Sequence, residues 1–302
     1  MARNPSGRRR RRWWLALAAL VLALAALAAW ALPWAVGTPP GMRLVKQRAD
    51  RILAPGSLGF DSLELSWFGP TRLRGFVLHN HQGQPVLSSP RAVWDRNLWQ
   101  ILFDRPRYGT LSFDGATLDV ERKADGTVDI YETIKPLITH NPRLDIAIKI
   151  DRAKLRFRSP ILAEPLRAEQ TRLDLRIPPA PKPITWDLQL AKQTPVDRQA
   201  GAPKPAQQTL HVSGSFDRWA SGPAQNISLD IAGNDWPLAL AQGGVAASGR
   251  FSGEVLVRRE SAHWRMEGRT WIAALDLAGD LLAGDHLLLD RVGGTWALAQ
   301  QA

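Results

Sequence analysis

The residues of this chain that could do chemistry are few, and they lie in turn-like stretches. His79 and His81 could present two imidazoles to a metal ion, but no Asp, Glu or Cys stands near them to complete a ligand set. Asp114 and Asp125 are each followed by glycine. That pair is typical of hairpin turns, because glycine accepts a positive φ and aspartate hydrogen-bonds its own backbone. We therefore expect neither a metal site nor catalytic carboxylates at these positions.

Sequence signatures of catalysis and of nucleotide binding are also missing. The chain contains no G-x-S-x-G motif, no Walker A motif and no G-x-G-x-x-G after a strand pattern. It contains no cysteine, which excludes disulfides, thiolate metal ligands and cysteine nucleophiles. The sequence therefore predicts a protein that is not an enzyme and that needs no cofactor or metal.

What the sequence supplies instead is an alternation of apolar and polar residues from Phe60 onward. A period of two predicts strands with one apolar and one charged face. Turn signals such as Gly243-Gly244 and Gly293-Gly294 separate the runs, which predicts antiparallel strands without crossover helices. Two exceptions are 97–103, a short helix or another strand, and 130–138, a helical turn cut by Pro136. The sequence thus predicts a mainly β protein with a long curved antiparallel sheet and few short helices.

Such a sheet needs something to cover its apolar face. The candidate helices after residue 60 are too few, which leaves a sandwich, a barrel, or an open groove that binds an apolar ligand. For the open groove, we predict a lining from the following apolar residues: Leu144, Ile146, Ile148, Ile150, Leu155, Phe157, Leu173, Leu175, Ile177, Trp186, Leu188 and Leu190. Prolines at 178–183 predict a stiff connector, and residues 193–208 a disordered loop.

The N-terminal region is composed differently from the rest. Residues 13–36 carry no charge, and they exceed the roughly 20 residues that cross a hydrocarbon core. A basic cluster directly precedes them, consisting of Arg8, Arg9, Arg10, Arg11 and Arg12. The positive-inside rule keeps such a cluster in the cytoplasm. We predict a cytoplasmic tip at 1–12 and a transmembrane anchor at 13–36, with a cleaved signal peptide as the alternative.

The remaining chain is then expected on the far side of the membrane, which is the periplasm if the source is a Gram-negative bacterium; the Arg-, Ala- and Trp-rich composition favours a bacterial source. We predict a linker with a short amphipathic helix at 37–59, followed by a β-rich domain at 60–302. The helix lies on the membrane surface or plugs one end of the sheet. Because six arginines precede the span, much of the net charge of +11 is a topology signal, and we expect no nucleic-acid partner.

Four segments together resemble a known family. They read RLRGFVLHN from Arg72, GQPVLSSP from Gly83, NLWQIL from Asn97 and TLSFDGATLDVERKADGTVDI from Thr110. With the basic tip, the span and the short helix, they are similar to the N-terminal region of AsmA/TamB-like proteins of Gram-negative envelopes. This similarity covers residues 10–135 by pattern, and the rest by strand periodicity alone. Its motifs are strand and turn signals rather than catalytic residues.

The resemblance implies an inner-membrane protein whose open β-groove shelters phospholipid and supports outer-membrane assembly or lipid homeostasis. The partners that it implies are phospholipid, the inner membrane and outer-membrane assembly proteins. Members that bridge the periplasm are usually several times longer, so we expect a short member or a fragment of a longer chain. The alternative function is a membrane-tethered β-sandwich scaffold that binds other envelope proteins.

Overall fold

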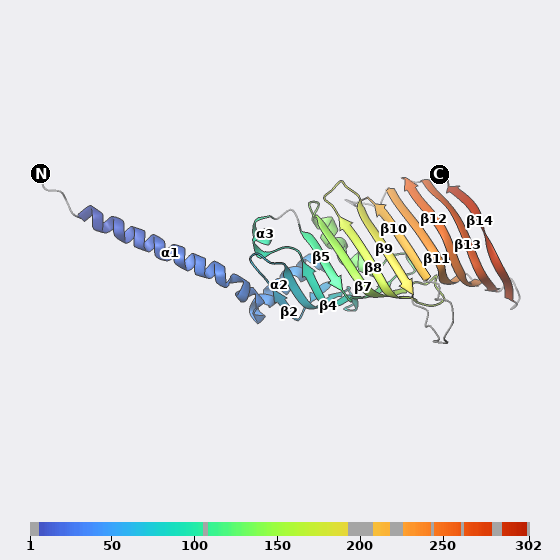
Figure 1. The fold of residues 1–302 in the computed structure, drawn as a ribbon, viewed down its shortest axis with the longest axis horizontal. Coiled ribbons are helices and arrows are strands. Elements are labelled where there is room, and N and C mark those ends of the chain that lie inside the picture. The colour runs from blue at the N-terminus through green and yellow to red at the C-terminus, as the bar shows by residue number, and fades with distance from the viewer. Residues whose placement is uncertain are drawn as a thin grey trace, which may run out of the picture.

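A computed structural model describes residues 6–104, 108–192, 208–217, 226–242, 245–260, 263–279 and 286–300. A long helix projects from one end of a mainly β domain, and the two chain ends lie at opposite ends of the molecule (Figure 1). The strands lie side by side along the long axis of the domain (Figure 1). This arrangement confirms the mainly β class with few helices.

Four helices lie in the described ranges: α1 (Ser6–Gly37), α2 (Pro39–Leu53), α3 (Leu98–Phe103) and α4 (Asp129–His140). The helix predicted within 37–59 is confirmed as α2, which begins with two prolines because the first turn needs no amide donors. It packs against β1 and α4, as expected of a helix that closes one end of the sheet.

The predicted transmembrane anchor, residues 13–36, lies within α1. No helix in the described residues is long and apolar enough to cross a membrane. The side chains at 8–16, 25–26 and 28–29 lie outside the described residues, and these include Arg8 to Arg12 and part of the expected span.

The described strands belong to one fourteen-stranded sheet. In chain order they are β1 (Ser57–Gly59), β2 (Ser62–Glu64), β3 (Thr71–His79), β4 (Pro85–Trp94), β5 (Gly109–Asp114), β6 (Thr117–Glu121), β7 (Ile146–Arg158), β8 (Leu166–Ile177), β9 (Ile184–Lys192), β10 (Gln208–Phe216), β11 (Asn226–Gln242), β12 (Val245–Glu260), β13 (His263–Gly279) and β14 (His286–Gln300). From β7 to β14 every strand pairs with the next one antiparallel.

The expectation of a sheet without a crossover helix is wrong at one place. Both β5 and β6 pair with β7 in parallel, and α4 provides the crossover between β6 and β7. Pro136 does not end this helix, which continues to His140. The apolar side chains of Ile130, Ile134 and Ile138 pack on the sheet, and that packing outweighs the one backbone hydrogen bond that the proline removes.

The turn predicted at Gly293-Gly294 is also wrong, because both glycines lie inside β14. A Cβ built on Gly293 would lie 2.2 Å from the carbonyl oxygen of Thr270 on β13. Glycine is therefore required there by the close approach of two backbones. The predicted loop at 193–208 and the turn at Gly243-Gly244 lie outside the described residues, apart from Gln208, which begins β10.

Candidate functional site: the apolar face of the sheet

Two rows of cross-strand neighbours carry apolar residues and glycines across the sheet from β7 to β14. The first row consists of Ile150, Leu173, Leu188, Val212, Ile231, Val255, Gly268 and Trp296. The second row consists of Ile148, Leu175, Trp186, Gly214, Leu229, Val257, Met266 and Leu298. We call these two rows the apolar track. Because directly opposed residues share a sheet face, the track is one continuous surface.

The glycines of the track are covered by aromatic rings from neighbouring strands. A Cβ on Gly214 would lie 3.1 Å from the indole of Trp186, and a Cβ on Gly268 would lie 2.9 Å from the indole of Trp296. Each ring therefore lies across the neighbouring strand, where a side chain would otherwise stand. The track keeps an apolar floor even where a strand contributes no side chain.

The predicted lining residues lie together at the β7–β9 end of this face. Four of them are buried, with exposed fractions of 1% for Leu144, 2% for Ile150, 1% for Ile177 and 4% for Leu190. The other eight are half-buried. Residues of α4, among them Ile134, pack against both clusters that hold Leu144, Ile150 and Ile177. At this end the face is therefore partly a closed core, and a lipid-lining role for these residues stays a prediction.

One rim of the face is closed by the chain itself. The loop between β7 and β8 reaches β11, where Leu162 and Leu240 form a bridge and Ala241 donates to the carbonyl of Ile161 at 2.9 Å. Beside this contact, Trp236 is 1% exposed and packs with Leu190 and residues of β7 and β8. The sheet therefore curls toward its apolar face here, since β9 and β10 separate β8 from β11 in the strand order.

The track continues beyond the predicted lining, over β10 to β13. Val212, Leu229, Ile231 and Val255 are half-buried rather than buried. The described helices make their main contacts with β1, β2, β4, β6 and one another, and the described strands form a single sheet. Sequence reasoning had found these residues as strands but had not assigned them to the lining. The alternation that identified the first runs continues through them and would have extended the prediction.

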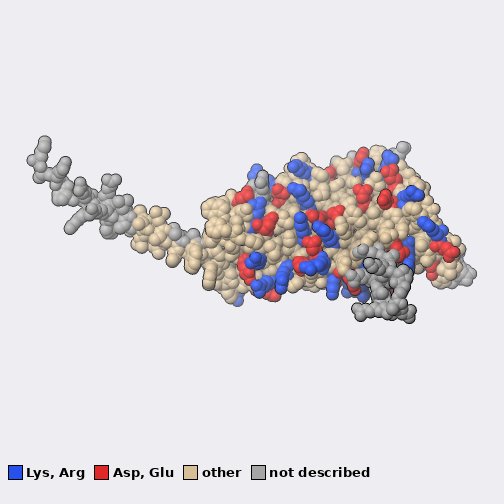
Figure 2. All heavy atoms as spheres, viewed as in Figure 1, with Lys and Arg blue, Asp and Glu red and all other residues tan. Residues whose placement is uncertain are grey.

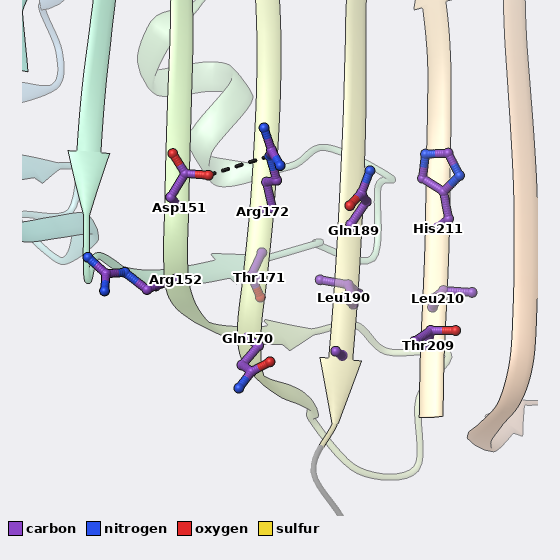
Figure 3. A pocket seen from close by; sticks show the side chains of 11 residues that line it. Asp151, Arg152, Gln170, Thr171, Arg172, Gln189, Leu190, Thr209, Leu210 and His211 are labelled. Atoms are coloured by element: carbon purple, nitrogen blue, oxygen red, sulfur yellow. Dashed lines mark ion pairs between the residues drawn. The ribbon is translucent and has the colours of Figure 1, made fainter. Parts of the chain in front are cut away.

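The opposite face of the sheet is polar. Figure 2 shows Lys, Arg, Asp and Glu side chains interspersed over the strands of this view. A shallow depression of ≈ 730 Å³ lies among Arg172, Gln189 and His211, which stand in a row on three strands (Figure 3). Arg172 pairs with Asp151 at 3.4 Å and His211 contacts Asp187 at 2.7 Å, so part of the charge on this face is paired. Such solvated pairs contribute little stability but keep the face wet.

The turns predicted at the two Asp-Gly pairs are confirmed. Gly115 and Gly126, which follow Asp114 and Asp125, have φ angles of 66° and 85°. Asp114 accepts hydrogen bonds from the Arg152 guanidinium, which lower the pKa of that carboxyl below its ordinary value. Hydrogen bonds from the side chain and backbone of Thr127 lower the pKa of Asp125 in the same way. Both carboxylates are held in turns by these hydrogen bonds, and Asp125 also lines a hollow of ≈ 530 Å³ between its turn and α4.

The histidine pair also forms no metal site in the described structure. His79 ends β3 and His81 lies in the following turn. Among the described residues, no group of three or more His, Cys, Asp or Glu side chains could hold a metal ion. The apolar track, which crosses eight strands, is therefore the best candidate for a functional surface.

No family model matches the chain, and no curated protein shows significant sequence similarity to it.

Proposed function

We propose that this chain is a membrane-anchored protein whose apolar track shelters the acyl chains of phospholipid and passes them along the sheet. The single observation that carries the proposal is the track itself, which is apolar in eight successive strands and, apart from the buried Val257, half-buried over β10 to β13. A surface of this size that stays accessible favours a ligand that is itself apolar and elongated.

The dimensions of the track suit an acyl chain. Strands lie about 4.8 Å apart, so the seven steps from β7 to β14 span roughly 34 Å. Each methylene that leaves water contributes about 0.8 kcal/mol, and no single polar contact is needed to hold the chain. Lipid could therefore move from strand to strand without breaking a strong interaction, while its head group stays in water at the rim.

Anchoring is the second part of the proposal, and it rests on the sequence. Residues 13–36 carry no charge and follow five arginines, a pattern typical of a single span with a cytoplasmic N-terminus. The sheet would then lie in the periplasm of a Gram-negative envelope, with β7 to β14 leading away from the inner membrane. Support of outer-membrane assembly or lipid homeostasis is the role that fits this placement.

The test measures phospholipid bound to the sheet domain. The full chain is isolated from cell envelopes, so that it has been exposed to phospholipid, and is cut at a protease site inserted after Thr38. The released domain is washed with detergent, and the lipid extracted from it is analysed by mass spectrometry. About one or more phospholipids per folded domain are expected. A folded domain without lipid would overturn the proposal and would favour the alternative, a tethered scaffold that binds envelope proteins.

A further inference from the structure

A second apolar surface lies apart from the track, at the end of the domain that joins α1. It consists of Phe68, Trp99, Leu102 and Phe103, with exposed fractions of 90%, 56%, 38% and 67%. We call these four residues the aromatic patch. Three of them come from α3, and Phe68 comes from the turn before β3. Large side chains this exposed, on one short helix and a turn that is hydrogen-bonded to it, mark an interaction surface.

The local structure holds the aromatic patch in place. Asn97 and Gln100 cap α3 reciprocally, with the Gln100 amide donating to the Asn97 side chain at 2.9 Å. Leu98 points into the domain and is 5% exposed, and its amide donates to the carbonyl of Ser66 at 2.8 Å. The Ser66 hydroxyl in turn accepts from the amide of Gly69 at 3.0 Å, which fixes the turn that carries Phe68. The exposure is thus built into folded structure.

The aromatic patch lies at the same end of the domain as α1, which favours the membrane as the surface that it contacts. The end of α1 packs on β2, and Ser66, two residues after β2, holds the start of α3. Figure 1 shows α3 at the end of the domain that α1 joins, and Figure 2 shows that end as mainly uncharged. The last turns of α1 add Trp30 and Trp34, which are 68% and 77% exposed with ring centroids 6.5 Å apart.

The composition of the aromatic patch also favours the membrane as its partner. Asn97–Phe103 contains no charged residue, and the neighbouring Arg96 is neutralised by Asp104 at 2.8 Å. The rings of Trp99 and Phe103 pack together with centroids 4.4 Å apart. Tryptophan and phenylalanine on the apolar face of a short surface helix are typical of segments that lie in the interfacial layer of a bilayer.

We propose that the aromatic patch is a second membrane contact, which inserts into the interfacial layer of the bilayer that α1 enters. The inference rests on the anchoring part of the proposed function. Two contacts at one end fix the tilt of the domain on the membrane, which a single helix does not. The near end of the sheet would therefore be held at the lipid surface, and the track would begin within reach of the bilayer.

The absence of cysteine allows a direct test in the full chain. Leu22→Cys reports on the anchor, Phe103→Cys on the aromatic patch and Ala297→Cys on the exposed far end of the sheet. Each variant is labelled with an environment-sensitive fluorophore and reconstituted in phosphatidylethanolamine–phosphatidylglycerol vesicles. Quenching by lipids with a nitroxide at a deep or a shallow position of the acyl chain is then measured.

We expect the deep quenchers to quench the label at position 22. The shallow quenchers should quench the label at position 103 several-fold more than the label at position 297. The double substitution Phe68→Ser and Trp99→Ser should reduce the quenching at position 103. If the labels at 103 and 297 were quenched equally weakly while the label at 22 was quenched in lipid, the membrane contact of the aromatic patch would be overturned, but the anchor would not. A label at 22 that is exposed to water would overturn the anchor itself. A label at 103 that is shielded from water but not quenched by lipid indicates a protein partner or a second copy, and it also overturns the inference.

Discussion

A charge placed in the first row of the apolar track should have very different effects at its two ends. Ile150 and Ile231 belong to the same row, but Ile150 is 2% exposed in a cluster that α4 packs against, whereas Ile231 is half-buried. We predict that Ile150→Asp unfolds the domain or nearly does so. Ile231→Asp should leave the domain folded and remove its bound lipid.

The magnitudes follow from burial. At Ile150 the substitution forfeits about 1.5–3 kcal/mol of apolar burial and places a carboxylate where it has no partner, at a further cost of several kcal/mol. The sum approaches the whole stability of a typical domain, about 5–15 kcal/mol. At Ile231 roughly half of the burial is lost, about 1 kcal/mol, and the carboxylate can remain hydrated.

The assay is urea unfolding followed by tryptophan fluorescence, combined with lipid analysis of each folded variant. Ala232→Asp is the matched control, because it places the same charge one residue away on the opposite face of β11. It should retain lipid. If Ile231→Asp were as destabilising as Ile150→Asp, the face over β11 would be a closed core and the argument for an open track would fail.

Three further predictions concern single residues. Gly253 has a φ of 138° and a Cβ on it would lie 2.2 Å from the carbonyl oxygen of Arg269, so Gly253→Ala should lower the free energy of unfolding by about 1–3 kcal/mol or more, whereas Gly294→Ala, which has open space, should change it little in denaturant titrations. The pKa of Asp114 is lowered chiefly by its hydrogen bond to Arg152, so its stabilising effect is present above the ordinary pKa and is lost as the pH falls; NMR titration should show Arg152→Ala moving the midpoint of Asp114 upward. Burial raises the pKa of Tyr131 above the ordinary value of 10.0, so stability should decline as the pH rises beyond that value, and the Tyr131 resonance should titrate at a higher pH than that of a free tyrosine.

The sequence predicted the strands well because alternation is a local signal. The runs at 144–150, 173–177 and 184–190 all lie on one face, as their period of two requires. It did not predict the parallel pairing of β5 and β6 with β7, because the partner of a strand depends on how α4 crosses between them. Local propensity predicts a break at Pro136, but tertiary packing outweighs it and α4 continues to His140.

The candidate site was predicted in part for a similar reason. Alternation showed that Ile148 and Ile150 face an apolar side, but it could not show that α4 packs on that side, which takes part of the predicted lining into a core. The closure between Leu162 and Leu240 joins segments far apart in the sequence and has no local signature. The aromatic patch was missed as a surface because exposure of Trp99 depends on which side of a short helix packs inward.

The most direct test of the apolar track compares two neighbouring residues on β12. Val255 lies in the first row and is half-buried, whereas Glu254 is exposed on the opposite face. A photoreactive amino acid replaces either one in the full chain, and adducts formed on irradiation of the cell envelope are identified by mass spectrometry. Phospholipid adducts at 255 and none at 254 are the predicted result. A folded chain that forms only protein adducts at 255, or equal lipid adducts at both positions, would contradict the account.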